Sequence, residues 1–267
     1  MKFFKMHGTG NDFIVLEPEN PEADWSAIAI KLCDRHFGIG ADGILLVLPS
    51  HSADFRMRIF NPDGSEAEMC GNGIRCITKH IIDSGLAHKS TKQLRIETLA
   101  GIIIVRPRLT NGVVSHVQVD MGVPIFTPAQ VPVDISQLKA QGDPRSLPMV
   151  RDYPLSVAGR VLPITCVSMG NPHAILFTQE PVDSFPLAEV GPKVEHHAFF
   201  PKRVNLEVVN IVDRGHARVR VWERGAGATL ACGTGACAVV AAGVTKGVLE
   251  SEVDIILPGG TLHIQWQ

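Results

Sequence analysis

The chain has 267 residues, 45% of them hydrophobic, which is enough for one large globular domain or two of ordinary size. Its 25 basic and 27 acidic residues give a net charge of −2 and form no basic stripe, which argues against nucleic acid or an anionic membrane as a partner. No apolar run reaches the length of a membrane span, and the first residues lack a secretory signal, so we expect a cytoplasmic protein.

Apolar periodicity in residues 1–118 predicts a β-rich first half with two helices. One helix is expected at 25–35, with Asp24 as its N-cap, and the other from a C-G-N-G motif at 70–73 to about residue 84. The Gly-rich stretch at 37–43 is not G-x-G-x-x-G after a strand, which excludes a dinucleotide site there. Strands are expected at 2–6, 13–17, 44–48, 55–60, 94–98, 102–105 and 113–119.

Residues 119–267 form the expected second half. The proline-rich segment 124–163 predicts irregular strands and loops that include the crossing between the halves. A short helix is expected at about 185–190 or a little longer, and another from a C-G-T-G motif at 232–235 to about 246. Strands are expected at 162–167, 174–177, 204–212, 217–221, 253–257 and 261–266.

The two C-G-x-G motifs stand in the same local setting, each after an acidic turn that contains glycine and before a helix. The order of strand, turn, motif, helix and strands therefore occurs twice. This repetition predicts an internal duplication, an α+β fold of two halves that face each other across a cleft. Each motif cysteine is then expected at a helix start, where unpaired N–H groups and the macrodipole favour a carboxylate and lower the pKa of a thiol.

Six cysteines in a long chain without an export signal favour reduced thiols over a disulfide framework. Their spacings lack the C-x2-C pairs that are typical of structural zinc sites. Cys70 and Cys232 are the motif residues. The other four, Cys33, Cys76, Cys166 and Cys237, are expected to be packing residues. A thiolate and a thiol on opposite sides of one α-carbon could remove a proton and deliver one, without metal or cofactor. Alternatives are a thiol redox protein and a protein that binds carboxylates without chemistry.

Further polar residues are candidates for substrate recognition, although turn-forming asparagines are commonly structural. Glu223 and Arg224 could pair with an ammonium and a carboxylate, or form a solvated pair of little energetic value. His173 could orient another group or satisfy a turn. The asparagines that lie in turns or at strand ends are Asn11, Asn61, Asn72, Asn171 and Asn205.

Nearly the whole chain resembles the diaminopimelate epimerase family. The resemblance is carried by H-G-T-G-N-D-F, F-N-P-D-G-S-E-A-E, M-C-G-N-G-I-R-C, M-G-N-P-H, V-N at 204–205, W-E-R-G-A-G and A-C-G-T-G-A-C-A. It implies a cofactor-independent two-base epimerase that interconverts LL- and meso-2,6-diaminopimelate in lysine and cell-wall synthesis. It also implies a homodimer, and two pseudo-symmetric halves that each wrap a mixed β-sheet around a central helix, with the active site in the cleft between them.

Carried onto matching positions, the resemblance makes Cys70 and Cys232 the acid–base residues, with His173 and Glu223 in support. Gly71, Asn72, Gly233 and Thr234 would contact the reacting carboxylate at the helix starts. The residues implied to bind the rest of the substrate are Asn11, Asn61, Asn171, Asn205, Glu223 and Arg224.

The sequence departs from the family pattern at two places. Gly43 stands where many members have Gln, and many members continue beyond residue 267 through a further M-T-G-P-A-type strand. The missing side chain at position 43 leaves an alternative function open, a racemase of another free amino acid. Related two-thiol racemases act on proline, hydroxyproline or histidine.

Overall fold

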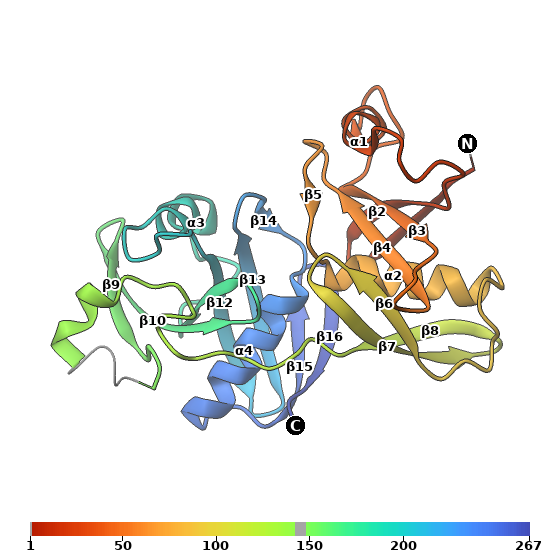
Figure 1. Cartoon of the computed structure of the whole chain (residues 1–267). Helices are drawn as coiled ribbons and strands as arrows, with labels where there is room; N and C mark the ends of the chain where they lie inside the picture. Colours follow the sequence, from red (N-terminus) through yellow and green to blue (C-terminus); the bar gives the residue numbers. More distant parts are fainter. Residues whose placement is uncertain (1, 142–147) are drawn as a thin grey trace. The chain divides into compact units, whose positions relative to one another are not determined.

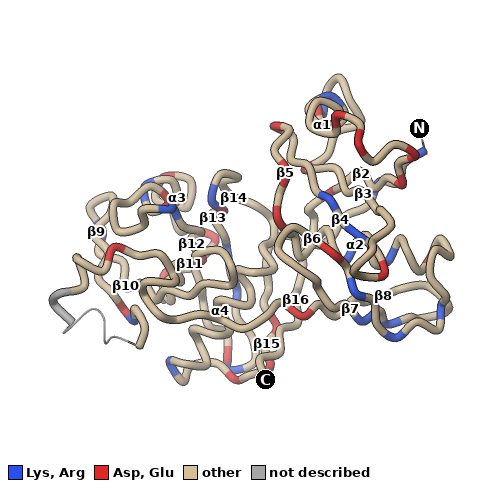
Figure 2. The backbone as a smooth tube through the Cα atoms, viewed as in Figure 1, with Lys and Arg blue, Asp and Glu red and all other residues tan. Residues whose placement is uncertain are grey.

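The computed structural model describes residues 2–141 and 148–267. The chain forms two compact units, Met1–Met121 and Gly122–Gln267, which we describe separately. Within the described residues, each unit is built on one eight-stranded mixed sheet with two α-helices, which confirms the α+β class (Figure 1). Lys and Arg are interspersed with Asp and Glu in both units (Figure 2).

The sheet of the first unit has the strand order β1-β2-β3-β4-β6-β7-β8, and the short β5 pairs with β4. Most neighbouring strands are antiparallel, whereas β2–β3 and β4–β6 are parallel. A helix precedes the second strand of each parallel pair. The elements are β1 Phe4–Gly8, β2 Asn11–Leu16, α1 Trp25–Cys33, β3 Gly43–Leu48, β4 Phe55–Phe60, β5 Glu66–Ala67, α2 Gly71–Asp83, β6 Leu94–Thr98, β7 Gly101–Thr110 and β8 Val113–Val119.

Helix α2 is the centre of the first unit. It contacts β1, β2, β3, β4, β7 and β8, so its apolar side chains, such as Ile77 and Ile81, are fully buried against the sheet. Each such buried side chain stabilises the fold by about 1.5–3 kcal/mol. Helix α1 packs against β3 and β4 through a second cluster around Trp25 and Ile44. Its start is capped by Asp24, as predicted.

The sheet of the second unit has the order β16-β15-β13-β12-β11-β10-β9, with the short β14 paired to β13. The parallel pairs are β11–β12 and β13–β15. The elements are a 3-10 helix at Ile135–Gln141, then β9 Tyr153–Val157, β10 Arg160–Ser168, β11 Pro172–Phe177, α3 Leu187–Glu195, β12 Asn205–Asp213, β13 His216–Glu223, β14 Gly227–Thr229, α4 Gly233–Lys246, β15 Glu252–Leu257 and β16 Gly260–Gln265.

Helix α4 is the central helix of the second unit and contacts β10, β11, β12, β15 and β16. Its buried face consists mostly of alanine and valine, which let it lie close to the strands. Helix α3 contacts β9, β12, β13 and β14 through a separate cluster that includes Val190 and Val194. The two units therefore share the arrangement of one central helix and one further helix.

Strand register shows that the repeat extends to single residues. Phe13 pairs with Gly43 at the start of one parallel pair, and His173 pairs with Asn205 at the start of the other. The following antiparallel pairs continue both registers up to Cys70 and Cys232, three residues after β5 and β14. The equivalent positions are Asn11 and Asn171, Phe13 and His173, Gly43 and Asn205, Leu45 and Glu207, Asn61 and Glu223, and Cys70 and Cys232.

Several sequence predictions needed correction. The strands expected at 2–6 and 13–17 lie at Phe4–Gly8 and Asn11–Leu16, so the turn between them has only two residues, Thr9 and Gly10, which both have positive φ. The helix expected at 185–190 begins at Leu187 and continues to Glu195. Short strands β5 and β14 lie in segments predicted as turns. In the segment expected to be irregular, β9 and the start of β10 form a regular hairpin, whereas residues 142–147 of that prediction lie outside the described residues.

Candidate active site

Cys70 is the N-cap of α2, as the sequence predicted. Its extended backbone (φ −142°, ψ 118°) turns the sulfur back over the first turn, where it accepts a hydrogen bond from the backbone N–H of Gly73 at 3.4 Å. A Cβ at position 73 would lie 2.9 Å from Leu45 Cδ2, so the glycine lets the helix start approach β3. The sulfur therefore lies at the positive end of the helix dipole.

Two predicted substrate residues contact this helix start. Cys70 Sγ donates to Asn11 Oδ1 at 3.7 Å, and Asn72 Nδ2 donates to the same oxygen at 3.3 Å. Asp42 Oδ2 accepts from Asn11 Nδ2 at 2.9 Å, which fixes the amide with its oxygen toward the sulfur. Arg75 donates to Asn72 Oδ1 at 2.7 Å, and its positive charge attracts the negative charge of Cys70 when that cysteine is ionised.

Cys232 occupies the same position at the start of α4. Its sulfur accepts from the backbone N–H of Gly235 at 3.4 Å and lies 3.3 Å from Thr234 Oγ1. Asn171 Nδ2 donates to Thr234 Oγ1 at 3.3 Å. This half of the site is therefore built from the residues that the sequence motif and M-G-N-P-H supply.

Beneath Cys232 lies a buried acid–imidazole pair. His173 Nδ1 is 2.7 Å from Glu207 Oε1, and both side chains are fully buried. His173 Nε2 is 3.0 Å from Asn171 Oδ1, so the imidazole connects the pair to the asparagine. The sequence analysis placed His173 here and missed Glu207. The available signal was a single acidic residue within the otherwise apolar run Leu206–Val209.

Glu223 and Asn205 belong to the same half-site. Glu223 accepts a hydrogen bond from Thr229 Oγ1, and burial raises the pKa of its carboxyl. Asn205 donates to Pro172 O at 3.0 Å and accepts from the backbone N–H of Arg224 at 2.8 Å, which ties β12 to the end of β13. The guanidinium of Arg224 is directed to Lys202 O at 3.2 Å.

The expectation that a helix start lowers the pKa of the cysteine is wrong for Cys232. Burial of this thiol, together with the negative charges of Glu223 and Glu207, raises its pKa well above the ordinary value. The hydrogen bonds from Thr234 and Gly235 act in the opposite direction and are outweighed. Cys232 is therefore a protonated thiol at neutral pH.

Asn61 and Gly43, which the sequence analysis singled out, both lie close to other parts of the backbone or turn around them. Asn61 Nδ2 donates to Ser65 Oγ at 2.9 Å within the turn before β5. At Gly43, a Cβ would lie 2.9 Å from the carbonyl oxygen of Phe60, so the backbone leaves little room for the glutamine that the family pattern has there. Asp42 and Arg75, which orient Asn11 and Asn72, were not predicted, because nothing in their sequence setting distinguishes them from surface charges.

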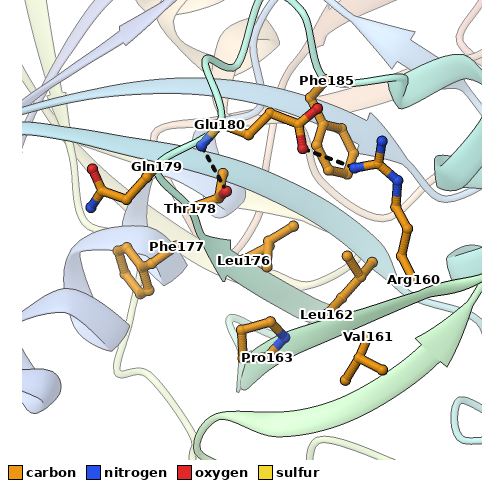
Figure 3. Close-up of a pocket in the computed structure, with 10 residues that line it drawn as sticks. All are labelled: Arg160, Val161, Leu162, Pro163, Leu176, Phe177, Thr178, Gln179, Glu180 and Phe185. Atoms are coloured by element: carbon orange, nitrogen blue, oxygen red, sulfur yellow. Dashed lines mark hydrogen bonds and ion pairs between the residues drawn. The ribbon is translucent and has the colours of Figure 1, made fainter.

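Other features of the described residues lie apart from these half-sites. A groove of about 410 Å³ on β10 and β11 is lined by ten residues, none of which is a predicted site residue (Figure 3). Arg160 and Glu180 form an ion pair at 2.8 Å across it. Within 2–141 and 148–267, no cluster of three His, Cys, Asp or Glu side chains is arranged to hold a metal ion. None of the helices described there is long and apolar enough to span a membrane.

A family model described as diaminopimelate epimerase matches residues 3–127 and 165–267. The chain belongs to the diaminopimelate epimerase family. Curated diaminopimelate epimerases match all of it: that of Acetivibrio thermocellus is 49% identical, with 91% of its own length covered, and that of Methanococcus maripaludis is 48% identical, with 92% covered. The relationship extends across both units and both C-G-x-G motifs.

Solved structures of more distant enzymes share the fold of this family member. A probable proline racemase from Agrobacterium radiobacter K84 has a TM-score of 0.70 at 16% identity, over 99% of this chain and 84% of that one. A hydroxyproline epimerase from Agrobacterium vitis has a TM-score of 0.68 at 16% identity, over 97% and 81%. At this identity the likeness establishes the fold and leaves the substrate to the family relationship.

Proposed function

We propose that the chain interconverts LL- and meso-2,6-diaminopimelate by cofactor-independent proton transfer at the α-carbon. The observation that carries this proposal is a match to diaminopimelate epimerases over the whole of this chain, in which the two C-G-x-G cysteines each cap a helix at equivalent positions of an internal repeat. Neither helix start alone can invert a stereocentre, because one base removes and returns a proton on the same face. Two thiols supply an acid and a base.

The environment of each thiol suggests its role at rest. Cys232 is protonated because its thiol is buried beside two carboxylates, so it acts as the acid in the first turnover. Cys70 then acts as the base, with Arg75 providing nearby positive charge. The contact from Cys70 to Asn11 Oδ1 suits the thiol that Cys70 becomes after it accepts the proton. The roles reverse for the other epimer.

The helix starts have a second task in this scheme. Removal of an α-proton places negative charge on the carboxylate of the substrate, and backbone N–H groups at a helix start stabilise such charge. Gly71 and Asn72 in one unit, and Gly233 and Thr234 in the other, are the first residues of these helices. We assign the remaining recognition to Asn11, Asn61, Asn171, Asn205, Glu223 and Arg224.

The experiment that tests this function is solvent exchange in D2O with LL-diaminopimelate and the reduced protein, without added cofactor. We expect deuterium at the α-carbon together with formation of the meso epimer. Cys70→Ala and Cys232→Ala should each abolish epimerisation, because each leaves one face of the carbon without its acid or base. Proline, hydroxyproline and histidine serve as alternative substrates in parallel.

The result that contradicts the proposal is a folded, reduced protein that exchanges no α-proton of diaminopimelate. Racemisation of proline or histidine in the same assay would keep the chemistry and change the substrate. The homodimer and the cytoplasmic location stay predictions. Analytical ultracentrifugation of the purified protein would test the first, and fractionation of the source cells would test the second.

A further inference from the structure

Glu207 is a buried carboxylate that the two-thiol scheme does not use. Its Oε1 contacts His173 Nδ1 at 2.7 Å, and its Oε2 is the one buried side-chain oxygen or nitrogen among the described residues that lacks a hydrogen-bond partner. A Cβ at Gly235 would lie 2.6 Å from Oε1, so the carboxylate presses against the first turn of α4. Burial of such a group is costly and calls for an explanation.

The internal repeat shows that the fold does not require this pair. The equivalent positions in the first unit are Phe13 and Leu45, which pack together as buried apolar side chains. The second unit has therefore replaced an apolar contact under the motif helix with an imidazole and a carboxylate. A purely structural role is met in the first unit without any charge, which points to a role in the chemistry of Cys232.

The carboxylate is linked to the thiol by a continuous series of contacts. It runs from Glu207 to His173 at 2.7 Å, from His173 to Asn171 at 3.0 Å, from Asn171 to Thr234 at 3.3 Å, and from Thr234 to Cys232 Sγ at 3.3 Å. In the first unit, Asp42 fixes the amide of Asn11 in one orientation. Asn171 instead faces an imidazole, which can donate or accept.

The direction of this series depends on Nε2 of His173. An ionised Glu207 can only accept, so the proton of Nδ1 stays between ring and carboxylate. In the structure Asn171 Oδ1 faces Nε2 and Nδ2 donates to Thr234, the orientation that suits a ring donating from Nε2. In a neutral ring with its proton on Nδ1, Nε2 can only accept, so the amide of Asn171 must turn over. Its oxygen then accepts from Thr234, and Thr234 Oγ1 accepts from the thiol of Cys232. In the imidazolium, Nε2 donates to Asn171, Asn171 donates to Thr234, and Thr234 donates to the Cys232 thiolate.

We propose that Glu207 is a positioning residue for the acid–base reaction. By keeping a proton on Nδ1 of His173, it couples the charge of the imidazole to the direction of the hydrogen bond between Thr234 and Cys232. A neutral His173 then accompanies the thiol, and a protonated His173 accompanies the thiolate. Without Glu207, a neutral ring could carry its proton on Nε2, and the coupling would be lost. This inference rests on the proposed function for its effect on turnover.

The test uses the full-length protein with ¹⁵N-labelled histidine and needs no substrate. The signals of His173 are assigned by their loss in His173→Phe. We expect Nδ1 to be protonated in the wild type and in Glu207→Gln, whose amide oxygen still accepts. In Glu207→Leu, which copies Leu45 of the first unit, we expect the proton of the neutral ring on Nε2. A wild-type His173 with a bare Nδ1 would overturn the proposal, even if neither variant folds.

Turnover of diaminopimelate gives a second, separate readout. We expect Glu207→Leu to lower kcat about 10- to 100-fold, the worth of one charge-assisted hydrogen bond, and Glu207→Gln to restore most of the loss. In a His173→Phe background, Glu207→Leu should lower kcat no further, because Glu207 acts through the imidazole. An equal loss in both backgrounds, or a folded Glu207→Leu with wild-type kcat, would contradict the proposal.

A matched control is available in the same unit. Glu252 contacts Nε2 of His263 at 3.0 Å, and both side chains are more than half exposed. Glu252→Gln should change neither the His173 signals nor kcat. If no variant and no wild-type protein turns over diaminopimelate, the proposed function fails, whereas the tautomer of His173 still decides whether Glu207 positions the ring.

Discussion

At the scale of single residues, position within one helix separates two thiols of α2. Cys70 is the N-cap, is partly exposed and contacts Asn11. Cys76, about two turns further on, is 3% exposed, and burial raises its pKa to about 12. One thiol therefore lies at a helix start, where we propose that it reacts, and the other packs as a small apolar side chain inside the core.

The shifted pKa of Cys76 predicts a pH dependence of stability. Between about pH 9 and pH 12 the unfolded chain releases this proton and the folded chain retains it, so the free energy of unfolding should fall with rising pH. The contribution of one such thiol is about 1.4 kcal/mol per pH unit. Cys76→Ala removes that contribution, so its urea-unfolding free energy should approach that of the wild type above pH 9. A difference between the two proteins that stays constant from pH 8 to about pH 11 would contradict this prediction.

At the scale of elements, packing extends α3 beyond its sequence signal. The sequence predicted a helix at about 185–190 or a little longer, and Gly191 and Pro192 both disfavour a helix interior. The helix continues to Glu195, because Glu195 accepts hydrogen bonds from Trp222 Nε1 at 2.8 Å and from Gly225 N at 3.0 Å. Such contacts between distant segments are not readable from local sequence.

The contact of α3 with β13 can be tested at Gly191. A Cβ there would overlap the indole ring of Trp222. We expect Gly191→Ala to lower the free energy of unfolding by about 1–3 kcal/mol, although alanine alone would favour the helix by about 1 kcal/mol. Glu189→Ala, on the exposed side of the same helix, should change stability by less than about 0.5 kcal/mol. A Gly191→Ala protein more stable than the wild type in urea would show that the ring moves away freely.

At the scale of the whole molecule, the sequence revealed the duplication because the C-G-x-G motifs retain their residue types. It did not reveal β5 and β14, which are two and three residues long and carry no alternating pattern. Nor did it reveal that Leu45 and Glu207 occupy equivalent positions of the repeat, because one side chain is apolar and the other is charged. Strand register in the folded units was needed to show that a charged pair replaces an apolar one beneath the second motif.

This duplication predicts that one chain supplies both thiols for one substrate molecule. Each unit carries its own sheet, central helix and capping cysteine, so a chain with either cysteine removed retains half of the acid–base pair. We therefore expect that Cys70→Ala and Cys232→Ala chains, co-expressed with different affinity tags and isolated as a mixed species, show no more epimerisation than the single variants. Activity restored to a substantial fraction of the wild type would mean that thiols of different chains act on one substrate.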